Sequence, residues 1–357
     1  MGTCGESVSG RDVIVTTVIS ASVPSLVADP VAIKRLGNAF CEAKLLLTAT
    51  ELGLFTMLDA GPATVEEVRV QLGLGDRGVR DFLDGLVALG LLERARETTR
   101  GDSYENGPAA SEFLVRGKEN YSGGFLERAN RMLYPAWGKL TEALRTGAPQ
   151  TPPHGEVLAD PAKLRAYLAM MDSVNGLLVA DLLELFPWSE QATVADIGGA
   201  RGNVAALLAS ANPGLRGTVF DLPAIAGAAR DHLAALGVSD RVTFQPGDFF
   251  ADDLPSADVL IMGHVLHNWS PEQRQELADK CYAALPSGGA LLIYDAMLDD
   301  ERQDISQLLI SLNMLLVTEG GSEYPVGECR DYLRKAGFAR TVAHPLGANN
   351  TLVIGYK

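Results

Sequence analysis

Segments of strand type alternate with segments of helix type from Ala192 to the end of the chain. The first two are "ATVADIGG", a buried strand with a glycine turn, and "GNVAALLASA", a helix. The alternation continues through "RGTVFDL", "AIAGAARDHLAAL", "RVTFQPGDFF", "ADVLIMGHVL", "PEQRQELADKCYAAL" and "GGALLIYDAML". Repeated strand–helix units require a parallel sheet with helices on both faces. The late strands "RTVAHPL" and "TLVIGYK" predict an antiparallel hairpin at one edge. The sequence therefore predicts an α/β fold with a doubly wound, mostly parallel sheet.

The first half of the chain has a different pattern, and it divides into three parts. Residues 1–30 are expected to form an N-terminal arm. Residues 31–105 contain three helical segments and a strand pair, the order of a winged helix-turn-helix. Residues 106–187 are mostly helical, with a proline-rich interruption at "GAPQTPPHGE", and residues 188–357 form the α/β domain.

A winged helix can bind DNA or another subunit. The third helical segment carries charged side chains that nearly cancel: Asp76, Arg77, Arg80, Asp81 and Asp84. A DNA-reading helix instead projects Arg, Lys, Asn or Gln toward the bases. The long apolar segment over residues 39–60 suits a contact between subunits, because such contacts are apolar. We therefore expect a homodimer and no nucleic-acid partner, with a DNA-binding regulator as the alternative.

Composition narrows the class of partner further. The 357 residues carry a formal net charge of −15, which repels phosphate backbones and anionic membranes. The four cysteines are far apart and form no CxxC pair, so no zinc ribbon or disulfide framework is indicated. The apolar stretch near the start contains Asp12 and Pro24 and is too short to span a bilayer. These features predict a cytoplasmic protein with a small-molecule partner and no membrane partner.

The turn "DIGGARG" after the first strand of the α/β domain predicts a ligand site. Gly198, Gly199 and Gly202 would allow a ligand close to the backbone. The spacing is not GxGxxG, and Asp196 just before the turn would repel a pyrophosphate. An acid at this place suits a cationic or amino-bearing ligand instead.

The next two strands end in residues that fit the rest of such a ligand. Asp221, in "FDLP" with Leu222, can accept hydrogen bonds from both hydroxyls of a ribose. Asp248, in "PGDFF" with Gly247, can accept from an adenine amino group, and Phe249 can stack on the ring. A nucleoside with a positively charged tail and no phosphate fits all these positions. S-adenosylmethionine (SAM) is such a molecule.

With these motifs, the sequence resembles the SAM-dependent small-molecule O-methyltransferases, including the caffeic acid, acetylserotonin and bacterial tailoring types. The resemblance covers about residues 35–357. Its motifs are "DIGGARG", "FDLP", "GDFF", "HVLHNWSPEQ", "LPSGGALLIYDAML" and "GGSEY". It implies a Rossmann-like SAM-binding domain, an N-terminal dimerisation domain, and methyl transfer to the hydroxyl of a small aromatic metabolite.

The resemblance also implies the catalytic residues. His267 of "LHNW" matches the family's general base, and Asp295 and Glu323 match two supporting acids. We expect Asp295 to hold the second nitrogen of the imidazole, and Glu323 to support that pair or the acceptor. The chain departs from the family at Asn268, where Asp is usual, and at Gly263, where plant members carry a lysine that helps hold SAM.

Bulky side chains of the helical segment are candidates for the acceptor pocket or for the core. By position Met314 matches a family methionine that clamps the acceptor, and Met170 or Met171 matches a second one. Trp269 is expected to pack beneath the catalytic loop. The full set of predicted acceptor-site residues is Phe125, Tyr134, Trp137, Met170, Met171, Asn175, Trp269 and Met314.

Other chemistries remain open at this point. The same fold can methylate carbon or nitrogen. His264, His267, Asp295 and Glu323 are possible metal ligands, and some relatives that methylate keto acids on carbon use iron. The HxxH spacing of the two histidines is weak for a metal, so no metal site is predicted. His264 is expected to be structural.

Overall fold

The computed structural model describes residues 29–96, 101–118 and 120–357. By its contacts the chain divides into two units, Met1–Phe40 and Cys41–Lys357. Nearly all of the predicted arm, residues 1–30, lies outside the described residues.

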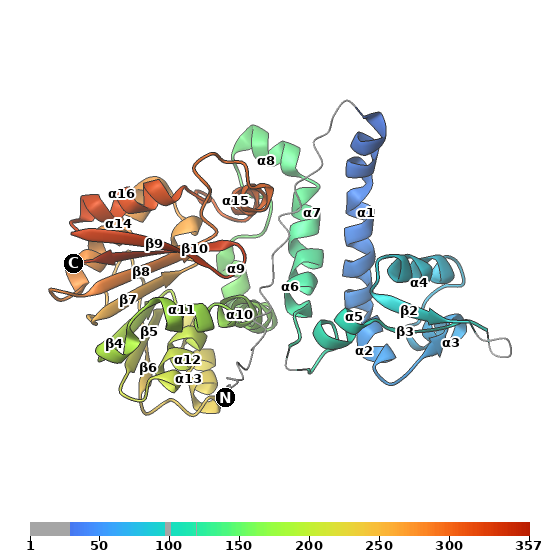
Figure 1. Ribbon diagram of the computed structural model, residues 1–357, viewed down its shortest axis with the longest axis horizontal. Helices are drawn as coiled ribbons and strands as arrows, with labels where there is room; N and C mark the ends of the chain where they lie inside the picture. Colours follow the sequence, from blue (N-terminus) through green and yellow to red (C-terminus); the bar gives the residue numbers. More distant parts are fainter. Residues whose placement is uncertain (1–28, 97–100, 119) are drawn as a thin grey trace, which may run out of the picture. The chain divides into compact units, whose positions relative to one another are not determined.

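The N-terminal elements combine helices with a small antiparallel sheet (Figure 1). They are α1 (Pro30–Leu52), α2 (Leu54–Leu58), β1 (Ala63–Thr64), α3 (Val65–Gln71), α4 (Val79–Ala88), β2 (Leu92–Ala95) and β3 (Ser103–Asn106). The strand order is β1-β3-β2. The side chains of Leu54, Phe55, Leu83, Leu86 and Tyr104 are fully buried among these elements.

Local sequence signals explain where these helices begin and end. Thr64 and Glu67 form a capping box at the start of α3. The apolar segment over residues 39–60 contains the end of α1 and all of α2, because Gly53 adopts a left-handed conformation with φ 73° between the two helices. Gly90, with φ 73°, follows the end of α4.

The middle of the chain is mostly helical, as predicted. Its elements are α5 (Pro108–Phe113), α6 (Gly123–Arg128), the π-helix η1 (Ala129–Leu133), α7 (Tyr134–Trp137), α8 (Leu140–Thr146), α9 (His154–Ala159), α10 (Pro161–Gly176), α11 (Val179–Leu185) and η2 (Trp188–Glu190). Within the described residues no single helix could cross a membrane by length and composition, although α10 and α11, bent by 41°, meet that test as a pair.

The α/β domain contains one seven-stranded sheet. Its strands are β4 (Thr193–Ile197), β5 (Arg216–Asp221), β6 (Val242–Pro246), β7 (Val259–Gly263), β8 (Ala290–Asp295), β9 (Arg340–Leu346) and β10 (Asn350–Tyr356). They lie in the order β6-β5-β4-β7-β8-β10-β9. The first five are parallel, and β10 pairs antiparallel with both β8 and β9. The predicted doubly wound sheet with an antiparallel edge hairpin is therefore confirmed.

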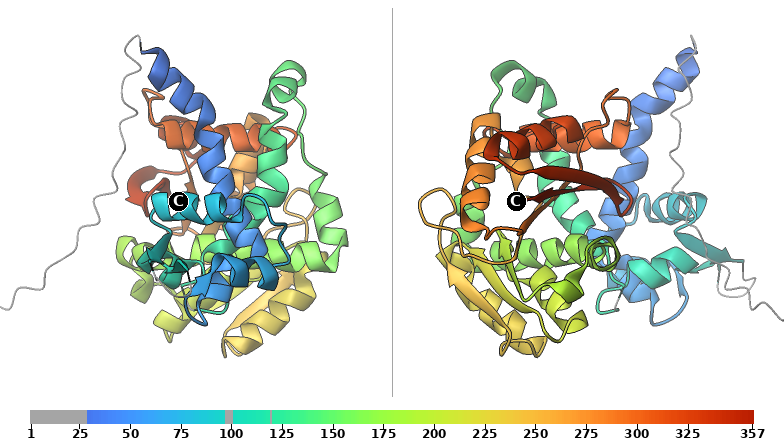
Figure 2. Two further views of the ribbon diagram at one scale, coloured as in Figure 1. Left: turned by 90° about the vertical axis from the view of Figure 1, so that its right-hand side faces the viewer. Right: turned by 60° about the vertical axis from the view of Figure 1, so that its left-hand side comes forward.

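Helices cover both faces of this sheet (Figures 1 and 2). One face packs against α14 (Pro271–Ala284) and α16 (Val326–Ala336). The other packs against α11, α12 (Asn203–Ala211) and α13 (Ala226–Ala235). The remaining elements are η3 (Pro223–Ile225), η4 (Leu266–Asn268) and α15 (Ile305–Val317). The central strands β4, β7 and β8 bury side chains on both faces, which explains why their sequences are nearly continuous apolar runs.

The topology brings the ends of four strands together. β4 and β7 are neighbours, although β5 and β6 lie between them in the sequence, so the strand order reverses there. Ligands of open α/β sheets bind beyond the carboxyl ends of the strands at such a reversal. The strand predicted to run through "GHVL" ends at Gly263, because His264, with φ 55°, turns the chain into η4.

Candidate active site

The turn between β4 and α12 is closely packed, and its glycines are required. Gly198 and Gly202 have φ values of 73° and 84°, where side chains are rare. A Cβ atom on Gly198 would lie 2.8 Å from Val265 Cγ2, and one on Gly199 would lie 2.5 Å from Asp196 Cγ. The turn can therefore bring bare backbone close to a ligand.

Asp221 reinforces this turn at the end of β5. Its carboxylate accepts a hydrogen bond from the Ala200 amide at 2.8 Å and another from the Leu222 amide at 2.7 Å. Burial raises the pKa of Asp221, while the two amides act in the opposite direction. A carboxylate offers about four acceptor positions, so two remain for a ligand's hydroxyl groups.

Asp196 is a buried acid with an unused oxygen. Its side chain is 3% exposed, and its Oδ2 atom has no hydrogen-bond partner in the described part of the chain. Burial, together with the charge of Asp221, raises its pKa to about 7. A buried unpaired carboxylate is costly, and a cationic ligand would relieve that cost.

These groups line one cavity, which also contains residues that sequence reasoning missed. Asp196, Gly198, Gly199 and Asp221 line it. His154 of α9 and Tyr167 of α10 lie on the same wall and contact each other edge to face, with ring centroids 5.2 Å apart. No sequence pattern marked them, since their helices approach the cavity only in the folded chain. The remaining lining residues are Met171, Asn175, Ala200, Val204, Ile225, Gly263, His264 and Tyr294.

Five predicted cofactor residues lie outside the lining of this cavity: Gly202, Leu222, Gly247, Asp248 and Phe249. The Asp248 carboxylate accepts from the Phe250 amide at 2.9 Å and so shapes its own turn. The Phe249 ring packs edge-on against Trp269, with centroids 5.7 Å apart. The adenine contacts of Asp248 and Phe249 stay predictions.

Tyr294 fills the space above Gly263. A Cβ on Gly263 would lie 2.0 Å from the Tyr294 Cζ atom, so the ring stands where a side chain at position 263 would begin. The Tyr294 hydroxyl lies 3.5 Å from Asn175 Oδ1 on α10.

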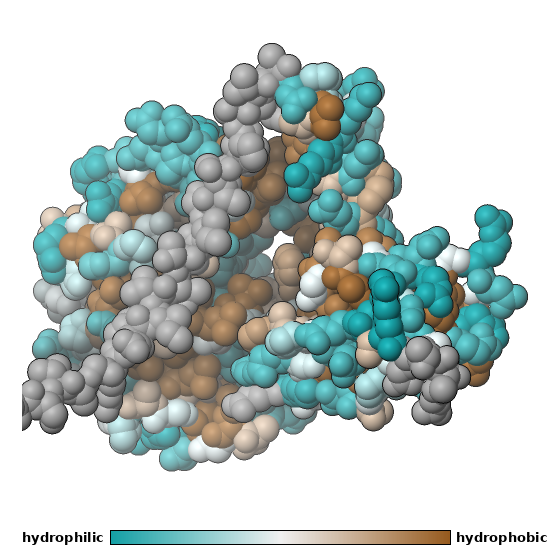
Figure 3. All heavy atoms as spheres, turned by 45° about the vertical axis from the view of Figure 1, so that its right-hand side comes forward, coloured by the Kyte–Doolittle hydropathy of each residue, from teal (hydrophilic) through white to brown (hydrophobic). Residues whose placement is uncertain are grey.

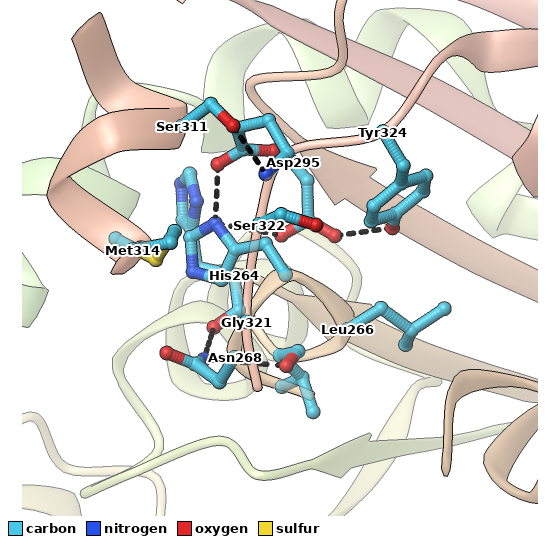
Figure 4. Close-up of polar contacts among 12 residues, drawn as sticks. His264, Leu266, Asn268, Asp295, Ser311, Met314, Gly321, Ser322 and Tyr324 are labelled. Atoms are coloured by element: carbon cyan, nitrogen blue, oxygen red, sulfur yellow. Dashed lines mark hydrogen bonds and ion pairs between the residues drawn. The ribbon is translucent and has the colours of Figure 1, made fainter. Parts of the chain in front are cut away.

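A buried histidine and two buried acids, His267, Asp295 and Glu323, lie close together. Figure 4 shows the polar contacts of this region, with Asp295 and Tyr324 labelled. His267 lies on η4. Its Nδ1 atom forms a hydrogen bond of 2.6 Å with Glu323 Oε1. Asp295 Oδ1 is 3.5 Å from the same nitrogen. Burial lowers the pKa of His267, but the charges of Asp295 and Glu323 outweigh it and raise the pKa to about 9.

The prediction that Asp295 holds the imidazole is wrong in one respect. Glu323 makes the direct hydrogen bond, whereas Asp295 Oδ2 accepts a 2.5 Å hydrogen bond from the Tyr324 hydroxyl. The shorter aspartate side chain at the end of β8 stops short of Nδ1. Burial raises the pKa of Asp295 to about 7 against the opposing charge of His267.

Arg274 on α14 holds the two loops of this cluster together, and sequence reasoning missed it. Its side chain is 1% exposed and donates to the Leu266 carbonyl at 3.1 Å and to the Ser322 carbonyl at 2.7 Å. The guanidinium also lies over the Tyr324 ring, 4.4 Å from its centroid. A buried arginine in an otherwise ordinary helix carried no visible signal.

The predicted acceptor residues differ in their surroundings. Met171 and Asn175 line the cavity of Asp196, while Met170 is buried elsewhere on α10. Met314, on α15, lies near His264 in Figure 4. On the same helix Asn313 accepts a 2.6 Å hydrogen bond from the Trp137 indole.

The other three candidates have different surroundings. The Phe125 side chain is 48% exposed. The Tyr134 ring lies under the Lys44 ammonium group. The Trp269 ring packs against Phe249 and Phe250.

Comparison with known proteins decides the family. Residues 137–339 match an O-methyltransferase domain, and residues 35–116 match an O-methyltransferase dimerisation domain. The chain belongs to the O-methyltransferase family. The predicted resemblance is confirmed, and the enzyme is a SAM-dependent methyltransferase.

Three similar proteins illustrate the relationship. The tetracenomycin polyketide synthesis 8-O-methyl transferase TcmO of Streptomyces glaucescens is 45% identical over 93% of this chain and 98% of its own. The N,N-dimethyltransferase OxyT of Streptomyces rimosus is 41% identical over 87% of this chain and 91% of its own. The structure of human N-acetylserotonin methyltransferase with SAM, 28% identical, superposes with a TM-score of 0.84 over 91% of this chain and 96% of its own.

The residues of the methyltransferase fit SAM. The unpartnered Asp196 oxygen suits a cationic ligand, the Asp221 carboxylate has acceptor positions left for ribose hydroxyls, and Gly199 leaves room that a side chain would fill. His264, His267 and Asp295 also present donor atoms within 4.8 Å of one another, a distance that admits a metal ion. A metal ion there would make turnover sensitive to a chelator, whereas a histidine base alone would not.

Proposed function

We propose that this methyltransferase transfers the methyl group of SAM to a hydroxyl of a small aromatic metabolite, with His267 as the general base. The observation that carries the proposal is the 2.6 Å hydrogen bond between His267 Nδ1 and Glu323, beside the cavity of Asp196 and Asp221. The similarity to TcmO over nearly its whole length supports an aromatic polyketide as the acceptor class.

In the proposed mechanism SAM supplies an electrophilic methyl group on a sulfonium ion. The protein must align the acceptor oxygen with it, and such positioning can contribute roughly 7–11 kcal/mol. Glu323 keeps the proton of the neutral imidazole on Nδ1, so that Nε2 carries the free lone pair. His267 Nε2 then takes the phenol proton as the oxygen–methyl bond forms and the sulfur–methyl bond breaks.

Replacing His267 tests this role. His267→Gln keeps a hydrogen-bonding side chain that cannot accept the proton at neutral pH. We expect turnover to fall on the order of 10²–10⁴-fold while the affinity for S-adenosylhomocysteine, measured by calorimetry, stays the same. Turnover equal to that of the unmodified enzyme would remove His267 from the chemistry.

Methyl transfer to nitrogen is the second candidate. It is favoured by the 41% identity to OxyT, whose name is N,N-dimethyltransferase. NMR of the methylated product separates the two, because methyl groups on oxygen and on nitrogen resonate at different shifts.

We also propose that the enzyme is a cytoplasmic homodimer whose N-terminal module does not bind DNA. The match of residues 35–116 to a dimerisation domain supports the dimer. Arginines of the module pair with acids: Arg69 with Glu66, Arg80 with Asp102 and Arg94 with Asp84. Hydrophobic side chains lie exposed among hydrophilic ones on the surface in Figure 3. Three cysteines of the described chain are free thiols, which agrees with a reducing compartment.

A further inference from the structure

His264 has a strained backbone that its neighbours maintain. Its φ of 55° lies in the left-handed region, which few residues other than glycine adopt. Its amide donates to the Tyr294 carbonyl at 2.8 Å, and its carbonyl accepts from Asn268 Nδ2 at 2.9 Å. An aspartate at position 268 would have no hydrogen to donate, so the departure of this chain at Asn268 supports the conformation of His264. Strain of this kind persists where the position of the side chain matters for function.

One nitrogen of the His264 side chain lacks a partner among the described residues. That nitrogen is Nε2, and it is buried. The side chain lines the cavity that contains Asp196 and Asp221. The ring stands perpendicular to that of Tyr294, 5.4 Å away, so packing determines its direction.

The two histidines form a pair at the site. Their ring centroids are 5.5 Å apart, and a ring nitrogen of His264 lies within 4.8 Å of one of His267. Figure 4 shows His264 near Asn268 and Met314. Because His267 Nδ1 is bonded to Glu323, the nitrogens available to an acceptor are His267 Nε2 and His264 Nε2, which is unpartnered in the described part of the chain. Two imidazoles whose centroids are this close can each contact one of two oxygens on neighbouring atoms of an aromatic ring.

We propose that His264 is a specificity-determining residue that hydrogen-bonds an oxygen next to the hydroxyl that is methylated, so that the enzyme selects aromatic acceptors with two neighbouring oxygens. This inference rests on the proposed function. Burial and the charge of His267 lower the pKa of His264 to about 3, so its ring stays neutral. A neutral imidazole has one donor and one acceptor nitrogen and can contact either a hydroxyl or a carbonyl.

The test compares two anthraquinones that share the same 2-hydroxyl group. 1,2-Dihydroxyanthraquinone has a neighbouring oxygen, and 2-hydroxyanthraquinone lacks it. We expect kcat/KM for methylation of the 2-hydroxyl to favour the first compound. In His264→Phe that preference should fall about tenfold, mainly through a higher KM for the dihydroxy compound. His264→Asn, which tolerates the left-handed backbone and keeps a hydrogen-bonding group, should retain part of the preference.

Three control measurements distinguish a contact with the acceptor from a structural role of His264. The affinity of His264→Phe and of His264→Asn for S-adenosylhomocysteine is measured so that both compounds are compared at saturating SAM, and His344→Phe on β9 should leave the preference unchanged. A purely structural role would lower kcat/KM for both compounds equally, and that result would overturn the proposal. Turnover of neither compound by the unmodified enzyme would overturn it too.

A metal site gives a different pattern. If His264 were a ligand, bound zinc or iron would be found in the purified enzyme, and a chelator and His264→Phe would both abolish its turnover. That outcome would overturn the proposal. The proposed function fails separately if the enzyme methylates no hydroxyl of any hydroxylated aromatic compound in a broad panel, whatever residue stands at position 264.

Discussion

At the scale of single residues, the length of each acidic side chain decides which carboxylate bonds the His267 imidazole. Sequence reasoning identified His267, Asp295 and Glu323 as one group, and the structure does bring them together. It could not assign the direct partner of His267, because that depends on backbone positions to within about the length of one methylene group. Asp295 stops short of the imidazole and bonds Tyr324 instead. Nothing in the sequence marked Arg274, whose role depends on loops far from it along the chain.

The pKa of His267 predicts how the rate depends on pH. A pKa of about 9 means that the imidazole is mostly protonated at neutral pH, and only the neutral form accepts a proton. We expect kcat/KM to rise with pH and to level off above about 9. Because a carboxylate favours the imidazolium ion, Glu323→Gln should shift this rise to lower pH.

Initial rates between pH 6 and pH 10 for both enzymes would test this prediction. Asp279→Asn is a suitable control, because Asp279 is an exposed residue on α14 that bonds Gln275. Identical profiles for Glu323→Gln and the unmodified enzyme would contradict the assigned hydrogen bond.

Tyr324 and Tyr332 offer a matched pair for stability. Both hydroxyls donate to acids, but Tyr324 donates to the fully buried Asp295, whereas Tyr332 donates to the exposed Glu328. Tyr324→Phe leaves a buried carboxylate without its donor, which should lower the free energy of unfolding by roughly 1–3 kcal/mol. Tyr332→Phe should cost less. Urea unfolding measures both, and equal losses would argue against the importance of the buried pair.

At the scale of elements, the strand–helix alternation predicted the order of strands and helices correctly. The sequence predicted the short turns between them less well. The order of strands and helices from β4 to β10 follows from periodic apolar runs, which local sequence displays. The end of β7 was misplaced, because the left-handed conformation of His264 depends on Asn268 and Tyr294. Sequence reasoning missed His154 and Tyr167 for a related reason. The spacing of apolar residues identifies the buried face of a helix, but it does not identify the cavity that this face lines in the folded chain.

The glycine turn gives a prediction at this scale. A methyl group on Gly199 would lie 2.5 Å from Asp196 Cγ, so Gly199→Ala must displace either the turn or the acid. We expect loss of S-adenosylhomocysteine binding, together with a lower unfolding free energy of about 1–3 kcal/mol. Gly214→Ala is the control, since nothing lies within 4 Å of the added methyl group. Calorimetric binding by Gly199→Ala equal to that of the control would contradict the close packing.

At the scale of the whole molecule, sequence reasoning predicted the sheet and the family, whereas the assembly remains to be measured. Helix α1 exposes large apolar side chains, which favours their burial by a second copy. The residues are Val31, Ile33, Leu36 and Phe40, each between 57% and 70% exposed. An acidic side chain among them would be poorly tolerated in an apolar contact.

We therefore expect a dimer in sedimentation velocity at micromolar concentration, and a shift toward monomer in Leu36→Glu. Val70→Glu serves as the control, because Val70 is 61% exposed on α3, outside α1. A monomeric unmodified enzyme at that concentration would contradict the proposed assembly.

The Tyr294 ring above Gly263 also constrains how this enzyme can evolve. No side chain fits at position 263 while the tyrosine is present, and removing the tyrosine alone leaves a void beside the cofactor site. Each change alone is therefore harmful, and the two become acceptable only together. Position 263 is where plant members carry a cofactor-holding lysine. We therefore expect that grafting such a lysine onto this chain would require positions 263 and 294 to be exchanged together.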